Sequence, residues 1–410
     1  MDMYANWRRN LYVVWISQFL AMIGFGCCMP FIPILLRESL NIDNEKLRGL
    51  YVSLYYLAGM SSLCIANIVW GILADKFGRK IMLLRASYAA AIFYPLLAFA
   101  PNFWILVLIR FICSFFSGTV VPAQTLLVST TPPEKHGFVL GAVSTSIWSG
   151  NMCGYLAGGL IVHYAGFKTA FMACGIIYLI SGALVHIFVK ENFHYSPEKK
   201  EKVKFSFKYL SSPVVFWLLV MFLIMGIARR IEHPFLAMQV ELVNGVDKAA
   251  FYTGIISAAA ALGGVLSGVV VGQLCDRYDP QKLIMPIIIS SAVFTLAQAF
   301  SVNIEMLTVS RFLTFFAAGG LQPVLQVILA KTTSAELRGT FFGWSGGINT
   351  AGGIVCSFIS GTLVLAAGVR SIFVAGAVML MMISIPFYFF KKSEKVEIFT
   401  VQNSREGVEK

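Results

Sequence analysis

The sequence predicts an all-α membrane protein, with twelve transmembrane helices arranged as two pseudo-symmetric six-helix bundles. Three observations lead to this fold class: the composition, the length of the apolar runs and an internal repeat. Of the 410 residues, 58% are hydrophobic and 13% are charged, and the mean hydropathy is +0.76. So few charges cannot cover the surface of a water-soluble protein of this size, so lipid is the expected solvent.

Apolar runs long enough to cross a membrane recur along the whole chain. A helix needs roughly 20 residues to span a hydrocarbon core of about 30 Å. The runs are too long for barrel strands and do not alternate between polar and apolar residues, so we predict helices. The predicted spans are 11–36, 49–71, 82–100, 103–127, 139–163, 167–189, 213–240, 250–273, 283–301, 304–330, 340–364 and 370–390.

The second half of the chain repeats the first. Identical residues recur 201 positions later for Gly71, Asp75, Arg110, Gly118 and Pro122. They recur 202 positions later for Glu134, Gly137, Gly141, Gly166 and Phe171. A duplicated six-helix unit explains this spacing. The predicted organisation is therefore a first bundle over 1–189, a Lys-rich linker over 190–212, a second bundle over 213–390 and a tail over 391–410.

Lysine and arginine are distributed unevenly between the two sides of the predicted spans. If the N-terminus lies inside, most of the 32 lysines and arginines fall in inner loops and tails, as the positive-inside rule requires. Both termini and the linker are therefore predicted to be cytoplasmic, in a multi-pass protein of the inner or plasma membrane. The net charge of +12 follows from this topology, and nucleic-acid binding is not needed to explain it.

A polar turn, GILADKFGRK, interrupts the apolar pattern at residues 71–80, and a fainter copy, GQLCDRYDPQ, occupies 272–281. The glycines of the 71–80 turn permit close packing and a tight turn. Asp75 can accept charge-assisted hydrogen bonds from a base or a helix N-terminus. The candidate gate residues are Gly71, Asp75, Gly78, Arg79 and Lys80. An ordinary basic inner turn is the alternative interpretation.

The 71–80 turn resembles the signature of the loop between spans two and three in the major facilitator superfamily. The twelve spans and the repeat extend this resemblance over the whole chain. The resemblance implies that two similar halves rock against each other and expose a site at the midplane to either side in turn. It also implies that this loop latches the cytoplasmic side.

Two further stretches are similar to the twelve-helix drug:proton antiporters of that family. The first span contains GFGCCMPFIP, and the fifth contains GNMCGYLAGG. In the fifth span the glycines match the antiporter motif, but Tyr155 stands where that motif has proline. Ordinary close packing of membrane helices also uses small residues at every fourth position, and it remains the alternative. The matching glycines are Gly150, Gly154, Gly158 and Gly159.

Charged residues inside the spans mark candidate functional positions, because an unpaired charge in hydrocarbon is costly. Arg110 resembles the buried arginine that the family uses in proton coupling, although a structural role for Arg110 and its repeat mate Arg311 stays open. The seventh span contains the charged stretch GIARRIEHP. We predict that these charges face the cavity. The alternative is that the span ends early and they anchor its outer end. The predicted proton-coupling residues are Arg110, Glu232 and His233, and the predicted cavity residues are Arg229, Arg230, Arg311, Pro30 and Pro33.

These features predict a secondary active transporter, with proton-coupled efflux of small organic molecules as the first hypothesis. Four arginines against one glutamate favour an alternative, a proton-coupled carrier of an organic anion such as a carboxylate-rich metabolite or a siderophore, in either direction. The third hypothesis is a membrane sensor that does not transport. The sequence shows no nucleotide-binding loop, nucleophile–base pair or metal-ligand spacing, so we expect no enzyme activity, metal or cofactor. Expected partners are a small-molecule substrate, protons and the lipid bilayer, and the chain is expected to be a monomer.

Overall fold

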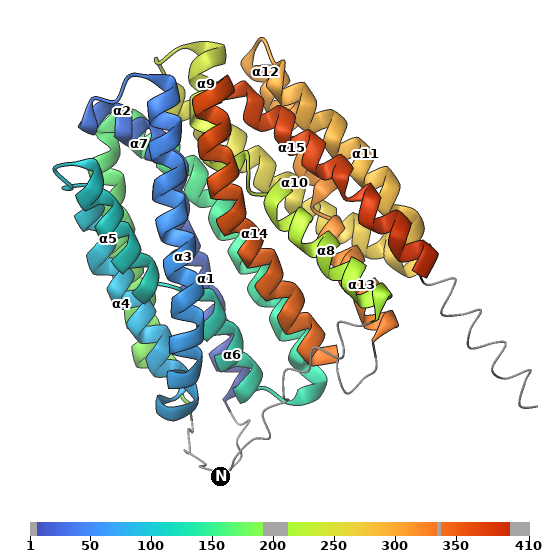
Figure 1. Cartoon of the computed structure of the whole chain (residues 1–410). Coiled ribbons are helices and arrows are strands. Elements are labelled where there is room, and N and C mark those ends of the chain that lie inside the picture. The colour runs from blue at the N-terminus through green and yellow to red at the C-terminus, as the bar shows by residue number, and fades with distance from the viewer. Residues whose placement is uncertain (1–5, 192–211, 334–337, 394–410) are drawn as a thin grey trace, which may run out of the picture.

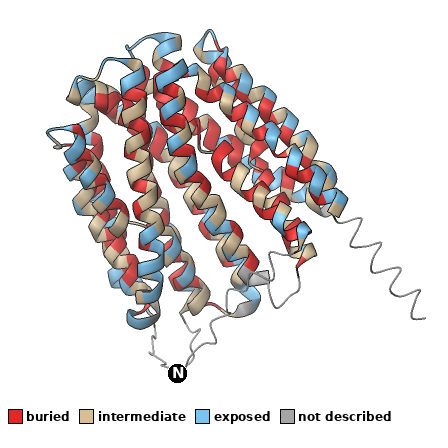
Figure 2. Cartoon of the chain, viewed as in Figure 1, coloured by how far each residue is buried: buried red, intermediate tan, exposed pale blue. Residues whose placement is uncertain are grey.

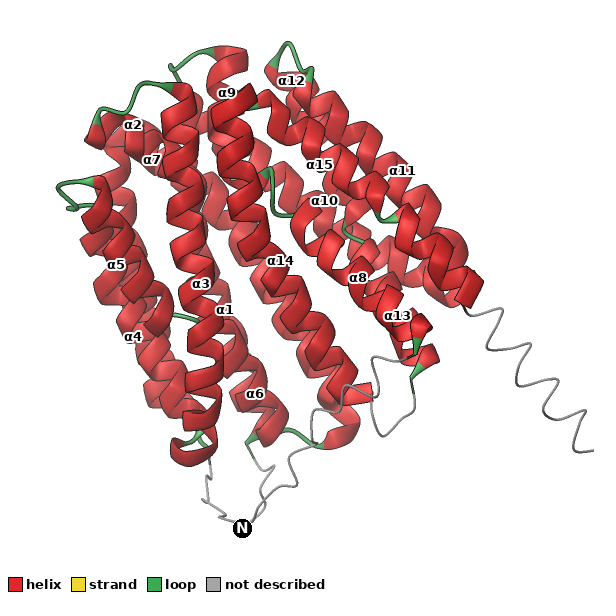
Figure 3. Ribbon diagram, in the orientation of Figure 1, coloured by secondary structure: helices red, strands yellow, loops and turns green. Residues whose placement is uncertain are grey.

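The computed structural model describes residues 6–191, 212–333 and 338–393. Within these residues the chain forms helices joined by short turns, and no strand occurs (Figure 3). The helices run side by side, with most of the first half on the left of Figure 1 and most of the second half on the right. The predicted linker and tail lie almost wholly outside the described residues, so the limits of the two bundles stay a prediction.

Helices make up both halves of the chain (Figure 1). Those of the first half are α1 (Trp7–Cys28), α2 (Ile32–Leu40), α3 (Glu45–Phe77), α4 (Arg79–Leu97), α5 (Phe103–Phe116), α6 (Val120–Thr130) and α7 (His136–Phe188). Those of the second half are α8 (Pro213–Ala228), α9 (Leu236–Asn244), α10 (Ala249–Arg277), α11 (Pro280–Ala299), α12 (Ile304–Ala318), α13 (Leu321–Thr332), α14 (Arg338–Ala367) and α15 (Arg370–Met382).

Eleven helical segments within the described residues are long and apolar enough to cross a membrane. One of them, α7, has 53 residues, and at about 1.5 Å per residue it is more than twice as long as the hydrocarbon core is thick. Its backbone leaves the helical conformation at Gly166, where φ is 76°, a value that favours glycine. This segment therefore holds two spans, which gives the twelve predicted. Gly368, with a φ of 77°, makes the same turn before the last span.

Asparagine side chains begin three of the helices. Asn44, Asn102 and Asn303 precede α3, α5 and α12. Each side-chain oxygen accepts a hydrogen bond from the backbone N–H three residues later, at 2.8–3.0 Å. This bond satisfies one of the donors that a helix N-terminus leaves free. Asn102 and Asn303 hold matching places in the two halves, so the repeat extends to the residues that cap the helix N-termini.

Large apolar side chains cover the outside of the helix assembly. Trp104, Ile176 and Val293 are 69%, 58% and 58% exposed. In Figure 2 the buried positions lie mainly between neighbouring helices, and exposed positions follow the outer helix faces. Water-soluble monomers rarely expose so much contiguous apolar surface. The exposed surface therefore suits a multi-pass membrane protein in contact with lipid.

Two spans are broken at proline in matching places. Short 3-10 turns interrupt the first span at Met29–Phe31 and the seventh at His233–Phe235. Proline cannot donate the helical hydrogen bond and its ring crowds the preceding turn, so Pro30 and Pro234 account for the breaks. A repeat spacing of 201 residues would pair Pro234 with Pro33, but in the structure Pro234 corresponds to Pro30.

The glycines of the fifth span let α7 approach two other helices. An added Cβ at Gly150 or Gly154 would lie 2.5 Å from a backbone carbonyl oxygen of α1. Gly158 also faces α1, whereas an added Cβ at Gly159 would lie 3.0 Å from the Cα of Gly254 in α10. The stretch GNMCGYLAGG therefore packs α7 between α1 of its own half and α10 of the other half.

We expect Gly154→Ala to destabilise the protein, and Gly141→Ala in the same helix to leave its stability unchanged or slightly higher. Alanine is favoured over glycine inside a helix by about 1 kcal/mol. At Gly154 the added methyl group meets a carbonyl oxygen, and such overpacking costs about 1–3 kcal/mol. Nothing lies within 4 Å of a Cβ added at Gly141. The measurement is the thermal unfolding midpoint of each variant in the same lipid. Equal midpoints for Gly154→Ala and Gly141→Ala would contradict this packing.

Candidate functional site

A break in the seventh span places charged side chains inside the membrane-spanning segment. The segment covers Pro213–Asn244, but α8 ends at Ala228 and α9 begins at Leu236. The charges of GIARRIEHP lie between these two helices, within the span and not in a loop outside it. Non-helical backbone at this depth is tolerated where it lines a cavity or is buried in protein.

A cavity of about 280 Å³ lies beside this break. Its walls come from α7 of the first half, and from the break, α10, α12, α13 and α14 of the second half. The lining residues are Ile147, Trp148, Asn151, Tyr155, Arg229, Arg230, His233, Ser257, Ala260, Ala261, Arg311, Phe315, Gln322 and Asn349. Three of these are arginines, and none of the described lining residues carries a carboxylate. The lining therefore has a net positive charge.

Two of the cavity arginines lie in the break and have neutral partners. Arg229 donates from Nη1 to Oε1 of Gln322, at 3.1 Å. Arg230 donates from Nη1 to the backbone oxygen and to Oδ1 of Asn349, at 2.7 and 2.8 Å, and reaches the carbonyl oxygen of Gly226 at 3.3 Å. Arg230 therefore satisfies a carbonyl group that the end of α8 leaves free, and ties α8 to α14.

The third cavity arginine, Arg311 of α12, forms a buried ion pair with Glu232. Arg311 Nη1 lies 2.8 Å from Glu232 Oε1, and the two side chains are 1% and 4% exposed. The same Nη1 donates to Oε1 of Gln298 at 3.0 Å, and the guanidinium lies 4.8 Å from the ring centre of Phe315. Within the described residues Glu232 Oε2 has no hydrogen-bond partner. The pair fastens the broken span to α12.

Arg110 lies in the first half and does not line this cavity. It is buried in α5, and its guanidinium lies 5.1 Å from the ring centre of Tyr55. No acidic partner for Arg110 occurs among the residues that the structure describes. Counted from the two break prolines, the first-half counterpart of Glu232 is Cys28. The two halves therefore differ, because Arg311 has a carboxylate partner where Arg110 faces an aromatic ring.

The predicted proton-coupling residue His233 lies in the cavity wall, and the predicted cavity residues Pro30 and Pro33 lie at the first-span break. His233 lines the cavity, with its ring centre 6.3 Å from that of Tyr155 in α7. Pro30 and Pro33 are buried at the first-span break and are not among the lining residues. Tyr155, which replaces the proline of the antiporter motif, is itself part of the cavity wall.

The polar turn before α4 is tied to the end of the sixth span. The carboxylate of Glu191 accepts hydrogen bonds from the backbone N–H groups of Arg79 and Lys80, at 3.0 and 2.8 Å, where the helix dipole favours an acid. Lys80 Nζ donates to the carbonyl oxygens of His186 and Val189 at the end of α7, at 2.9 and 2.7 Å. Glu191, which follows α7, thus caps the start of α4, and Lys80 of α4 caps the end of α7.

Other residues of this turn have different surroundings. Gly78 has a φ of 91°, a conformation that favours glycine. Nothing lies within 4 Å of a Cβ added at Gly71. The side chains of Asp75 and its repeat mate Asp276 lie outside the described part of the structure, so the latch role of Asp75 stays a prediction.

The two ends of the molecule differ in how closely the halves approach. We call the end that carries the 71–80 turn the motif face, and the opposite end the Glu241 face. Toward the Glu241 face, a Cβ added at Gly254 would lie 2.6 Å from the backbone oxygen of Tyr155 in the other half. Toward the motif face, several glycines have nothing within 4 Å of an added Cβ, among them Gly71, Gly141, Gly268, Gly272 and Gly343. These glycines therefore record close backbone contact between the halves toward the Glu241 face and no such contact near the motif face.

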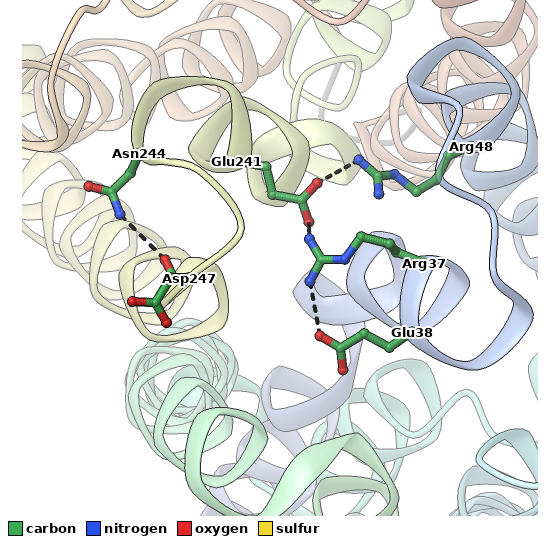
Figure 4. A network of polar contacts seen from close by, with 6 residues as sticks. All are labelled: Arg37, Glu38, Arg48, Glu241, Asn244 and Asp247. Carbon is green, nitrogen blue, oxygen red and sulfur yellow. Dashed lines mark hydrogen bonds and ion pairs between the residues drawn. The ribbon is translucent and has the colours of Figure 1, made fainter.

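Glu241 of α9 joins the two halves (Figure 4). Its Oε1 accepts a hydrogen bond from Nη1 of Arg37 in α2, and its Oε2 accepts one from Nη2 of Arg48 in α3, both at 2.5 Å. Arg37 also pairs with Glu38, at 2.9 Å. The side chains of Glu241 and of both arginines are largely buried. One carboxylate of the second half thus holds two arginines of the first.

Comparisons with known proteins agree with this architecture. The family model of the Major Facilitator Superfamily matches residues 14–297 and 234–405. The multidrug resistance protein MdtG of Salmonella choleraesuis is 31% identical over 376 residues, which cover 91% of this chain and 93% of that protein. MdtG of Salmonella arizonae matches to the same extent.

Two solved structures share the fold. The nucleoside transporter NupG has a TM-score of 0.71 at 16% identity, covering 96% of this chain and 100% of that one. A bacterial homologue of the human lysosomal transporter Spinster, in an inward-facing and unoccupied conformation, has a TM-score of 0.72 at 14% identity, covering 95% of this chain and 98% of that one. With the family model and relatives above 30% identity covering most of its length, the chain belongs to the Major Facilitator Superfamily.

Proposed function

We propose that this protein is a secondary active transporter that exports small organic molecules by alternating access, with protons as the coupling ion. The observation that carries the proposal is the central cavity, which is walled by both halves and adjoins a broken span. Alternating access needs such a site to be reached from one side at a time. Relatives named multidrug resistance proteins support the export of small molecules.

We place the motif face in the cytoplasm, because most loop lysines and arginines belong to that side. In this orientation the described conformation is inward-open, since Glu241 closes the outer side while the helices are parted at the motif face. In the outward-open conformation the contacts of Glu241 would break and the motif face would close. The glycines at the inner ends of α3, α7, α10 and α14 suit that closure, because small residues let helices approach. Asp75 would then hold the inner side.

For proton coupling we propose Glu232, with Arg311 as its partner. Protonation of Glu232 would remove the negative charge that neutralises Arg311, and Arg311 lines the cavity. Proton and substrate would therefore act on the same guanidinium, which couples their binding free energies. His233, beside Glu232 in the cavity wall, and Arg110 in the first half are the further candidates.

We expect everted membrane vesicles that contain the protein to accumulate small organic probes when their interior is acidified. Such vesicles expose the cytoplasmic side, so export from the cell becomes uptake into the vesicle. The probes are ethidium, 1-naphthalenesulfonate and 1-naphthylmethylammonium, and accumulation of at least one should stop when a protonophore is added. Vesicles without the protein provide the control. Accumulation of no probe, or accumulation that ignores the pH gradient, would contradict proton-coupled export.

A further inference from the structure

We infer that the central cavity binds aromatic organic anions and that Arg229 holds their acidic group. The inference rests on the proposed transport function for its biological meaning, but it is tested by binding. The three cavity arginines are not equivalent. The Nη1 of Arg230 is used by Asn349 and by the end of α8, and the charge of Arg311 is neutralised by Glu232.

Arg229 is the cavity arginine with the most donors left for a ligand. Among the described residues it makes one hydrogen bond and Arg230 makes three, whereas Arg311 is paired with Glu232. The hydrogen-bond partner of Arg229 is the amide oxygen of Gln322, which satisfies one donor and neutralises no charge. A guanidinium has five N–H donors in a planar fork that fits the two oxygens of an acidic group. The side chain of Arg229 lines the cavity and is partly exposed, so a ligand in the cavity can contact it.

The rest of the lining fits an aromatic body. Trp148 and Tyr155 come from α7 of the first half, and Phe315 comes from α12 of the second. Trp148 is held in place by α10, where a Cβ added at Gly264 would lie 3.0 Å from its ring. Aromatic rings stack on such side chains. The volume of about 280 Å³ is near the lower end for ligand pockets, so one or two fused rings fit best.

The same lining disfavours a cation. None of the described lining residues carries a carboxylate, and Glu232, which is not among them, is paired with the lining residue Arg311. A cationic ligand would therefore face uncompensated positive charge in a poorly solvated site. We expect the cavity to select the anion from two ligands that share one ring system.

The test measures binding of 1-naphthalenesulfonate and 1-naphthylmethylammonium to purified protein in lipid nanodiscs. Both carry the same ring, and a sulfonate stays ionised at every pH used. The wild type should bind the sulfonate more tightly than the ammonium. Arg229→Gln should weaken sulfonate binding by about ten- to hundredfold, and leave ammonium binding unchanged or tighter. Arg229→Lys should lie between, because lysine keeps the charge and loses the fork.

Two control variants separate this site from general effects. Arg85→Gln removes a positive charge from a different cavity, beside Trp70, and should not change the preference for the sulfonate. Trp148→Ala should weaken both probes, whereas Trp104→Ala, at an exposed position on the outer surface, should weaken neither. Unfolding midpoints show that each variant is folded.

The outcomes distinguish this inference from the proposed function. Sulfonate binding that depends on Arg229, in a protein that moves no probe into vesicles, supports the anion site and contradicts transport. Vesicle accumulation of the ammonium, together with a wild type that does not bind the sulfonate, supports transport and overturns the anion site. Equal sulfonate binding by the wild type and Arg229→Gln also overturns it.

Discussion

Replacing Glu241 with glutamine is expected to open the Glu241 face and close the motif face. The substitution removes the charge that holds Arg37 and Arg48 of the other half, and it leaves two like charges close together. Charge-assisted hydrogen bonds contribute about 1.5–3 kcal/mol each, and solvent at the rim of this face lowers that figure. A net loss of about 2 kcal/mol changes the ratio of the two conformations about thirtyfold.

Distances between spin labels in a cysteine-free background measure this change. One label pair, at Leu47 and Val246, lies on exposed positions of the two halves near Glu241. The other, at Phe77 and Tyr278, lies on exposed positions near the motif face. In Glu241→Gln the first distance should lengthen and the second should shorten.

Glu38→Gln is the matched control for this substitution. Glu38 also pairs with Arg37, but both residues belong to the first half, so neither label distance should change. Identical distances in Glu241→Gln and the wild type would show that this carboxylate does not hold the halves together.

Much of the fold follows from composition and the lengths of apolar runs. Twelve spans could be counted because each run exceeds the length that a bilayer core requires. The interruptions within spans were harder to predict. The predicted span 103–127 consists of two helices separated at 117–119, and 304–330 is likewise divided at Gly319 and Gly320. Glycine in a helical pattern is compatible with either continuation or a break, so packing decides.

The charged part of the cavity was the predictable part of the site. Arg229, Arg230 and Arg311 are predictable from the sequence because arginine in an apolar span is costly. The structure brings all three into one cavity. Trp148 and Gln322 line the same cavity, but aromatic and amide side chains are ordinary in membrane helices and give no comparable signal.

The contacts between distant residues could not be predicted from local sequence. Glu241 lies about two hundred residues from Arg37 and Arg48, and a lone acid near the end of a span has no distinctive pattern. Glu191 follows the sixth span and looks like any linker residue, yet it caps α4. Such pairings depend on how helices from separate parts of the chain pack, which a single sequence without covariation does not specify.

The buried pair of Glu232 and Arg311 is expected to give the largest stability effect. Glu232→Gln and Arg311→Gln each leave one charge without its partner among residues that exclude water, and breaking such a pair costs about 3–5 kcal/mol. The double variant Glu232→Gln/Arg311→Gln keeps the shapes and removes both charges. Its unfolding midpoint should therefore recover most of the loss, and a midpoint below both single variants would contradict a direct pairing.

The same variants separate a structural role from proton coupling. If Glu232 only fastens the broken span to α12, the double variant should regain pH-driven accumulation together with its stability. If Glu232 carries the coupling proton, the double variant should be stable and should still exchange labelled for unlabelled substrate across vesicles, while a pH gradient no longer drives accumulation. Exchange needs the cavity and the conformational change but no net proton movement, so it isolates the coupling step. Gradient-driven accumulation by a folded Glu232→Gln variant would exclude Glu232 and leave His233 and Arg110 as the candidates.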